Sequence, residues 1–296
     1  MTPVVVLTIA GSDSSGGAGL QADLKTFAAH RVHGACAVTA VTAQNTTAVR
    51  GVVALDPDFV VDQIDAVLAD LPVAAVKTGM LATSGIVAAI ASAAAAGRLP
   101  NLTVDPVLVS STGHLLTDEG GVAAYRDLLL PLAEVATPNL REAAVLTGRP
   151  LADLASVEAM IEAAQEIRSL GATTVVVKGG HLDAARAGSS DGPDRGPAGP
   201  AEPASPDVVA GPDGVHVLDG GRVATANDHG TGCSLSAAIA ARLALGDGHV
   251  AAIRAAKRYV AGALVGAAGW RLGSGHGPID HFGWSSDRSG PVTGPS

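Results

Sequence analysis

The stretch VVVLTIAGSDSSGGAGLQADLKTFAAH, residues 4–30, predicts a strand, a glycine-rich turn and a helix in that order. Residues 4–10 are apolar or β-branched, which is typical of a buried strand. After the turn, the apolar residues of 19–30 recur at the spacing of one helical face. We therefore expect this stretch to form a strand–helix unit of an α/β fold.

The same alternation continues along the chain. Further strands are expected at residues 35–42, 74–77, 102–104, 134–136 and 173–178. Helices are expected at residues 59–70, 84–97, 120–130, 157–170, 234–245 and 250–270. Near-continuous apolar strands between amphipathic helices are typical of a parallel sheet covered on both faces. We predict a single α/β domain over residues 1–284, with a mostly parallel central sheet and helices on both faces.

Two segments differ from this pattern. Residues 187–214 are dominated by Gly, Pro, Ala, Ser and Asp, and they predict an inserted surface loop that serves as a spacer rather than a lid. A hairpin is expected to follow it, with strands at residues 215–218 and 223–226. Residues 285–296 are expected to form a disordered tail.

Composition excludes several classes of protein. The chain has 19 basic and 28 acidic residues, a net charge of −9, and 2% aromatic residues. Nucleic-acid and anionic-membrane binders need a basic face, and base-stacking platforms need aromatic side chains. Cys36 and Cys233 are too few for a disulfide framework or a metal cluster. The longest apolar run, residues 86–96, is shorter than the roughly 20 residues that span a bilayer, and no signal-peptide pattern is present. We expect a soluble, cytoplasmic protein.

The turn after the first strand is a candidate ligand site, because ligands bind at the carboxyl ends of parallel strands. Residues 11–16 have the spacing of a P-loop, but Gly17 and Ala18 stand where it needs Lys and Ser/Thr. Residues 17–22 match a loose dinucleotide fingerprint, yet no acidic residue ends the next strand to hold a ribose. Two interpretations remain: a plain turn before a helix, or backbone that closes on a small ligand faced by Asp23.

Other strands end in polar groups. Gln44 offers an acceptor and two donors, which suits a heteroaromatic edge, although a loop-capping amide explains it equally well. Met80 is either a core residue or a ligand contact. Asp105 ends an apolar strand, where a carboxylate is costly unless it is paired or binds a metal such as Mg²⁺. Asn139 can cap the next helix, with Glu142 closing a capping box.

The strongest single signal is NDHGTGCS, residues 227–234, which opens an alanine-rich helix. Such a helix start presents N–H groups and the positive end of the helix dipole to an anion. Cys233 in this first turn is expected to have a lowered pKa, a route to a reactive thiolate. The alternative is that Thr231 or Ser234 is a plain N-cap and Cys233 a small buried filler.

Together these motifs resemble the hydroxymethylpyrimidine/phosphomethylpyrimidine kinases of the ribokinase-like superfamily. The matching motifs run in order across nearly the whole chain: TIAGSDSSGGAGLQADLKT at 8–26, AQNT at 43–46, KTGML at 77–81, DPV at 105–107, TPNLRE at 137–142, KGGH at 178–181, HGTGC at 229–233 and GHGP at 275–278. The resemblance implies a ribokinase-like fold.

The resemblance also implies a role for each matching residue. The pyrimidine would be bound by Gly11, Asp23, Gln44 and Met80. An anion hole for the transferred phosphoryl group would consist of Gly230, Thr231, Gly232 and Cys233, with Cys233 standing where sugar kinases carry an aspartate base. The ATP phosphates would lie near Lys178 and Asn139, and Mg²⁺ would be held by Asp105 and Glu142.

The implied activity is an ATP- and Mg²⁺-dependent kinase of thiamine biosynthesis, acting as a homodimer. It would phosphorylate 4-amino-5-hydroxymethyl-2-methylpyrimidine and then the resulting monophosphate. A pyridoxal or pyridoxine kinase is the first alternative, and a non-catalytic pyrimidine-binding protein is the second. One departure concerns phosphate handling: residues 111–114 read STGH where many members carry Lys-Ser-Gly-Asp.

Overall fold

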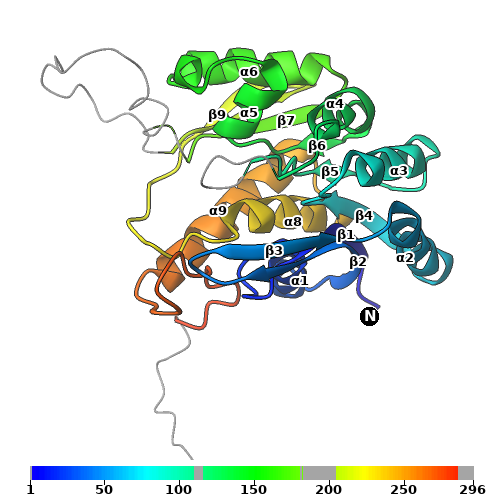
Figure 1. The fold of residues 1–296 in the computed structure, drawn as a ribbon. Coiled ribbons are helices and arrows are strands. Elements are labelled where there is room, and N and C mark those ends of the chain that lie inside the picture. Colours follow the sequence, from blue (N-terminus) through cyan, green and yellow to red (C-terminus); the bar gives the residue numbers. More distant parts are fainter. Residues whose placement is uncertain (1, 110–115, 181, 183–204, 286–296) are drawn as a thin grey trace, which may run out of the picture.

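The computed structural model describes residues 2–109, 116–180, 182 and 205–285, which form one α/β domain around a nine-stranded sheet (Figure 1). The strand order is β3-β2-β1-β4-β5-β6-β7-β8-β9. The strands are β1 (Val5–Ser12), β2 (His33–Gln44), β3 (Val49–Ala54), β4 (Val73–Thr78), β5 (Thr103–Val104), β6 (Val135–Ala136), β7 (Thr174–Lys178), β8 (Asp207–Gly211) and β9 (Gly214–Leu218).

The centre of the sheet is parallel and its two edges are antiparallel. β2, β1, β4, β5, β6 and β7 pair in parallel with their neighbours. β3 pairs antiparallel with β2 at one edge, and β8 and β9 add antiparallel strands at the other. The mostly parallel sheet predicted from the sequence is therefore confirmed.

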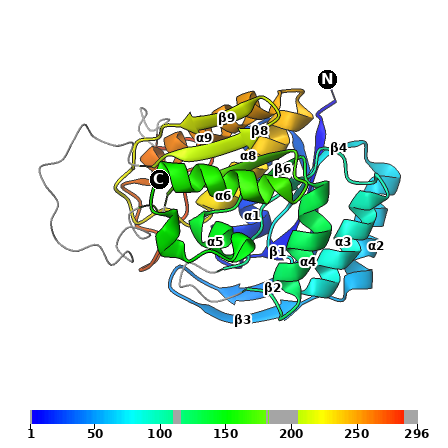
Figure 2. The same ribbon diagram turned by 90° about the horizontal axis from the view of Figure 1, so that it is seen from above.

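Helices cover both faces of the sheet (Figures 1 and 2). They are α1 (Gly19–Ala29), α2 (Pro57–Asp70), α3 (Ser84–Ala95), α4 (Gly121–Ala124), α5 (Leu140–Thr147), α6 (Val157–Ser169), α8 (Thr231–Ala244) and α9 (His249–Ala267), with the short turns η1 (Tyr125–Leu129), η2 (Leu130–Leu132) and η3 (Leu151–Leu154). In both views α8 and α9 lie side by side, as do α2 and α3.

The two-sided cover explains why the strands read as unbroken apolar runs. Leu7 and Ile9 of β1 pack in the core under α2 and α3, whereas Val6 packs on the other face with α1 and α8. β7 repeats this arrangement, with Val175 and Val177 on one face and its central valine on the other. Successive side chains of a strand point to opposite faces, so both sets must be apolar when both faces are buried.

The strand predicted at residues 215–218 is confirmed as β9, but the pairing predicted for it is wrong. β9 pairs with β8, which lies inside the segment 187–214 that the sequence predicted as a loop, and residues 223–226 form no strand. Three consecutive residues of β8, Val208, Val209 and Ala210, are buried. Their apolar signal is short and stands next to a Gly/Pro-rich composition, which concealed it. Residues 187–204 and 286–296, predicted as loop and tail, lie outside the described residues.

Two further elements differ from expectation. β3 was not predicted, because all six of its residues are exposed and give no alternation between a buried and an exposed face. The helix expected at 120–130 starts as α4, widens into the π-helical turn η1 and tightens into η2. Pro131 lies in η2 and cannot donate the backbone hydrogen bond that would continue an α-helix.

A buried ion pair joins α1 to the sheet. The Lys77 Nζ of β4 lies 2.9 Å from both carboxylate oxygens of Asp23 in α1, and both side chains are completely buried. The Thr8 hydroxyl of β1 donates a further hydrogen bond of 2.6 Å to Asp23. The pair thus connects three elements below the carboxyl end of the sheet.

No helix in the described part of the chain combines the length and apolar character needed to cross a bilayer.

Replacing Lys77 with Met should lower the free energy of unfolding by about 3–5 kcal/mol, because the Asp23 carboxylate would remain buried without its cation. Urea denaturation followed by circular dichroism measures this change. The double variant Lys77→Met/Asp23→Leu is the matched control and should recover most of the loss, since it buries no charge. A single variant that unfolds like the wild type would contradict the expectation.

Candidate active site

The parallel strands bring several charged and polar side chains to one edge of the sheet. Thr78, Val104, Ala136 and Val175 lie in one register row across β4, β5, β6 and β7. The residues that follow this row therefore emerge at the same edge. Ligands of open parallel sheets bind at this edge, close to the point where the strand order reverses beside β1.

Two glycine-rich turns, one after β1 and one before α8, contact each other at this edge. Gly230 has a φ of +83°, and a Cβ there would lie 1.9 Å from the carbonyl oxygen of Gly17. A Cβ on Gly17 would in turn lie 2.5 Å from the ring of His229. Only glycine permits both the left-handed backbone and this close approach. The turn after β1 therefore packs directly against the turn before α8.

The amino terminus of α8 faces the site without a side-chain cap. Its N-cap residue is Gly230, so the alternative that Thr231 or Ser234 is the N-cap is wrong. The Lys178 Nζ of β7 lies 3.3 Å from the position that a Cβ on Gly232 would occupy. A lysine and the positive end of a long helix thus meet at one point, which favours an anion there.

The prediction that Cys233 has a lowered pKa is wrong. Burial raises the pKa of its thiol to about 11, and although Lys77 lowers it, the carboxylates of Asp23 and Asp105 raise it further. The backbone N–H of Gly19, at the start of α1, donates to the thiol and opposes the increase. Desolvation and two neighbouring negative charges raise the pKa of the thiol more than Lys77 and the Gly19 N–H lower it, so Cys233 is a neutral thiol at neutral pH.

Asp105 and Lys178 form an ion pair in the floor of the site. The Lys178 Nζ lies 3.0 Å from the Asp105 Oδ1, which also accepts from the Thr137 hydroxyl at 3.0 Å. The second carboxylate oxygen accepts from the Ser236 hydroxyl of α8 at 3.1 Å. Burial alone would raise the pKa of Asp105, but Lys178, Lys77 and these hydrogen bonds lower it. The expected cost of a carboxylate at this strand end is thus offset by pairing.

Asn139 and Glu142 form the capping box expected for α5. The Glu142 backbone N–H donates to the Asn139 side chain at 3.0 Å, and the Asn139 N–H donates to the Glu142 Oε2 at 2.7 Å. Burial and the negative charge of Asp105 raise the pKa of Glu142 to about 8, although Lys178 opposes this. The capping interpretation of Glu142 is therefore confirmed.

The two carboxylates fit a magnesium ion better than a metal held by protein ligands alone. In the part of the chain that the structure describes, no group of three His, Cys, Asp or Glu side chains is arranged to hold a metal. Mg²⁺ commonly takes one or two carboxylates and completes its shell with water and phosphate oxygens. Burial and the charge of Asp105 raise the pKa of Glu142, so a divalent cation beside the two groups would favour the ionised form of Glu142.

The four predicted pyrimidine contacts separate into two groups. Met80 lies against Gly11, where a Cβ would come within 2.5 Å of its Cε, and the Gly11 N–H donates to the Met80 carbonyl at 3.1 Å. Asp23 instead is completely buried beneath the site and holds Lys77. The Asp23 side chain is thus not exposed at the surface of the site, and its predicted contact with the pyrimidine stays a prediction. Gln44 ends β2 and lines an open hollow with Ser14, Ala43, Asn45 and Arg50.

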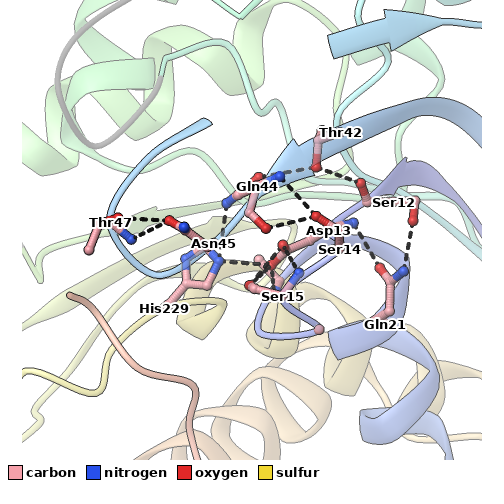
Figure 3. A network of polar contacts seen from close by, with 12 residues as sticks. Ser12, Asp13, Ser14, Ser15, Gln21, Thr42, Gln44, Asn45, Thr47 and His229 are labelled. Atoms are coloured by element: carbon pink, nitrogen blue, oxygen red, sulfur yellow. Dashed lines mark hydrogen bonds and ion pairs between the residues drawn. The ribbon is translucent and has the colours of Figure 1, made fainter. Parts of the chain in front are cut away.

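Figure 3 shows a polar network that connects Gln44 to both glycine-rich turns. The Asp13 Oδ2 lies 2.9 Å from the His229 Nε2, and the Gln44 side-chain nitrogen lies 3.3 Å from that same imidazole nitrogen. Asp13 also accepts from the backbone N–H of Ser15 and of Ala18, each at 2.8 Å. The network fixes the turn after β1 against the turn before α8.

No sequence pattern indicated a role for Asp13, His229 or Lys77. Lys77 carried a detectable signal, because a lysine inside an otherwise apolar strand needs a buried partner. Asp13 and His229 are 216 positions apart in the chain, and no local pattern predicts their contact. Residues 111–114, whose departure from the kinase pattern concerned phosphate handling, lie outside the described residues.

The fold and the site define a member of the ribokinase-like group of α/β proteins. The model of the family "Phosphomethylpyrimidine kinase" matches residues 13–280. A hydroxymethylpyrimidine/phosphomethylpyrimidine kinase from Synechococcus elongatus is 46% identical over 282 residues, covering 95% of this chain and 98% of its own. The protein of the same name from Escherichia coli is 38% identical over 282 residues, with the same two coverages. The chain belongs to the phosphomethylpyrimidine kinase family.

Solved structures extend the similarity to two kinds of kinase. The pyridoxal kinase of Staphylococcus aureus in complex with ADP has a TM-score of 0.82 at 34% identity, covering 98% of this chain and 96% of its own. The phosphomethylpyrimidine kinase of Clostridium difficile 630 has a TM-score of 0.71 at 37% identity, covering 87% of this chain and 97% of its own. The ribokinase-like fold expected from the sequence is therefore confirmed.

The state of the Cys233 thiol can be measured by alkylation. Only the thiolate reacts with iodoacetamide, so with a pKa of about 11 the rate at Cys233 should keep rising up to pH 10 without a plateau. Mass spectrometry of the Cys233 peptide gives the rate separately from that of Cys36. The urea-unfolded chain is the control and should level off above its ordinary pKa of about 8.5. A plateau below pH 8 in the folded protein would contradict the raised pKa.

Proposed function

We propose that this chain is an ATP-dependent kinase that phosphorylates the hydroxymethyl group of 4-amino-5-hydroxymethyl-2-methylpyrimidine and then phosphorylates the monophosphate to the diphosphate. The product would serve thiamine biosynthesis. The observation that carries the proposal is the amino terminus of α8, which is not capped by a side chain and has Lys178 and Cys233 beside it. Relatives bearing the corresponding name span nearly the whole chain, which supports the choice of substrate.

The transferred phosphoryl group would lie against Gly230, Thr231, Gly232 and Cys233. The developing negative charge there would be stabilised by the backbone N–H groups and dipole of α8 and by Lys178. Phosphoryl transfer passes through a loose transition state that needs positioning and charge stabilisation above all. We assign Lys178, with Asn139 at the start of α5, to the phosphates of ATP. Kinases of similar structure have been solved with ADP and AMP-PCP, which supports the use of ATP.

Cys233 would contact the substrate hydroxyl, and only its thiolate form could accept the hydroxyl proton. Its raised pKa means that little thiolate is present at neutral pH. Proton removal would therefore contribute late, after bond cleavage in the donor phosphate has advanced, and would not be needed to create an alkoxide first. Charge stabilisation by α8 and Lys178 would supply most of the rate enhancement.

Asp105 and Glu142 are the carboxylates that would hold Mg²⁺ near the phosphates. A bound Mg²⁺ would supply positive charge beside the phosphate oxygens. Lys178 keeps Asp105 ionised, and the capping box fixes the orientation of Glu142. The chain would thus provide the Asp105 carboxylate and the Glu142 carboxyl, which the bound cation would ionise, and water and phosphate oxygens would complete the shell.

Product analysis tests this function. Purified protein incubated with ATP, Mg²⁺ and the pyrimidine should yield its monophosphate and then its diphosphate, detected by mass spectrometry. Replacement of Cys233 with Ala should lower kcat much more than it lowers the affinity for the pyrimidine, because the thiol acts at the reacting centre. Formation of neither phosphate by the wild-type protein would refute the proposal.

A pyridoxal kinase activity is the second candidate. It is favoured by the TM-score of 0.82 with the Staphylococcus aureus pyridoxal kinase, against 0.71 with the Clostridium difficile phosphomethylpyrimidine kinase. Competition between pyridoxal and the aminopyrimidine for one pool of ATP distinguishes the two. We expect the pyrimidine to be phosphorylated preferentially, since identity to the pyrimidine kinases reaches 46%.

We further propose that the chain forms a homodimer through β3 and the adjoining part of β2. Val41, Val49, Val52 and Val53 are each about half exposed or more on this antiparallel edge. An exposed apolar edge strand offers both unpaired backbone groups and apolar area to a second copy.

We also propose a cytoplasmic location, because ATP is supplied there and the chain's two cysteines are free.

Light scattering coupled to gel filtration tests the assembly. The wild-type protein should have the mass of a dimer, and Val53→Glu should give a monomer, because it places a charge in the buried interface. Val265→Glu is the control, since Val265 is similarly exposed but lies on α9. A wild-type monomer at micromolar concentration would exclude the dimer.

A further inference from the structure

The polar network of Figure 3 contains an ion pair whose role the proposed chemistry leaves unassigned. The Asp13 side chain is 4% exposed and lies 2.9 Å from the His229 Nε2. Burial alone would raise the pKa of Asp13, but hydrogen bonds from His229, Ser15 and Ala18 outweigh this effect and lower it. Asp13 is therefore a carboxylate that can only accept hydrogen bonds.

This acceptor determines which nitrogen of His229 carries the proton. A carboxylate oxygen 2.9 Å away requires an N–H at the His229 Nε2. The Gln44 side-chain nitrogen lies 3.3 Å from the same atom, and in that orientation two donors would face each other. Turning the amide over places its oxygen toward the imidazole N–H, with no change in shape.

Thr42 supports the same amide orientation from the other side. Its hydroxyl donates to the Ser12 carbonyl at 2.9 Å, so its single hydrogen is already used. The amide atom of Gln44 that lies 3.4 Å from the Thr42 hydroxyl is therefore best matched by an NH₂ group, for which the hydroxyl is the acceptor. His229 and Thr42 thus both require the Gln44 oxygen toward His229 and the nitrogen toward Thr42.

We propose that Asp13 and His229 are positioning residues that fix the Gln44 amide in this single orientation and thereby select a heteroaromatic ligand whose edge carries a donor beside an acceptor. The proposal rests on the proposed function. An aminopyrimidine has such an edge, with its exocyclic NH₂ next to a ring nitrogen. A pyridoxal ring has no amino group beside its nitrogen, and a methyl-bearing carbon separates its ring hydroxyl from that nitrogen. An amide fixed in one orientation favours hydrogen bonding to the aminopyrimidine edge, whereas a freely rotating amide would accommodate either ring.

Replacement of Asp13 with Asn preserves the shape of the side chain but removes the requirement for an N–H at the His229 Nε2. Titration calorimetry with 4-amino-5-hydroxymethyl-2-methylpyrimidine in the absence of ATP should show the affinity fall by about tenfold or more, since a mispaired buried polar group costs this much. KM for the pyrimidine should rise while kcat stays unchanged. Affinity for pyridoxal should change by less than about twofold.

The Gln44→Ala background distinguishes positioning from a merely structural role. If Asp13 acts through Gln44, Asp13→Asn should alter the affinity of the Gln44→Ala protein by less than about twofold. Asp228→Asn is the matched control, because it removes an acidic group one residue from His229. Asp228 pairs with the exposed His276 and not with His229, so this variant should bind the pyrimidine as the wild type does. His229→Ala provides a second variant with the same expected pattern, should Asp13→Asn fail to fold.

The outcomes separate this proposal from the function on which it rests. Wild-type protein that binds no aminopyrimidine would overturn the proposed function together with this inference. Wild-type binding, with the same loss from Asp13→Asn in the wild-type and Gln44→Ala backgrounds, would overturn only the positioning role. A loss confined to the background that retains Gln44 would support it.

Discussion

The site depends on one close contact between two backbone turns that are far apart in the chain. Gly17 follows the first strand and Gly230 precedes α8, and a Cβ on Gly230 would overlap the carbonyl oxygen of Gly17. This contact brings the amino termini of α1 and α8 together, so that the N–H of Gly19 reaches the thiol of Cys233. The Asp13–His229 ion pair holds the same two turns together through side chains. Without this approach, the predicted anion site and pyrimidine site would be separate surfaces.

Buried charge beneath this contact sets the electrostatics of the site. Lys77 with Asp23 and Lys178 with Asp105 form two ion pairs near the carboxyl end of the sheet, with the lysines on β4 and β7. Buried charges persist in a protein only when they are paired and hydrogen-bonded, and each of these carboxylates has further hydroxyl donors. The pairs leave Cys233 near both positive and negative groups, and burial then decides that its thiol stays protonated. The helix terminus and Lys178 therefore stabilise charge, whereas the Cys233 thiol stays neutral beside them.

Sequence patterns predicted the elements whose signals are local. The six central strands, the two-sided helical cover and the capping box at Asn139 all follow from apolar periodicity or from fixed spacing. Strands that are recognisable only from their pairing with distant segments were not predicted. β8 was concealed in a Gly/Pro-rich segment because its burial comes from pairing with β7 and β9, and β3 has no buried face to reveal it. The pKa of Cys233 was predicted from its helix position alone, without the desolvation and carboxylates that tertiary packing adds.

The sequence by itself determined the α/β class, the family motifs and the residue types available at each strand end, because these are properties of short stretches of chain. Tertiary structure alone decided which of those residues share a site. It buried Asp23 under the site as the partner of Lys77. It also joined Asp13, His229 and Gln44 from three distant segments. The physical reason is that hydrogen-bond geometry and desolvation depend on neighbours in space, and these are set only when the sheet brings its strand ends together.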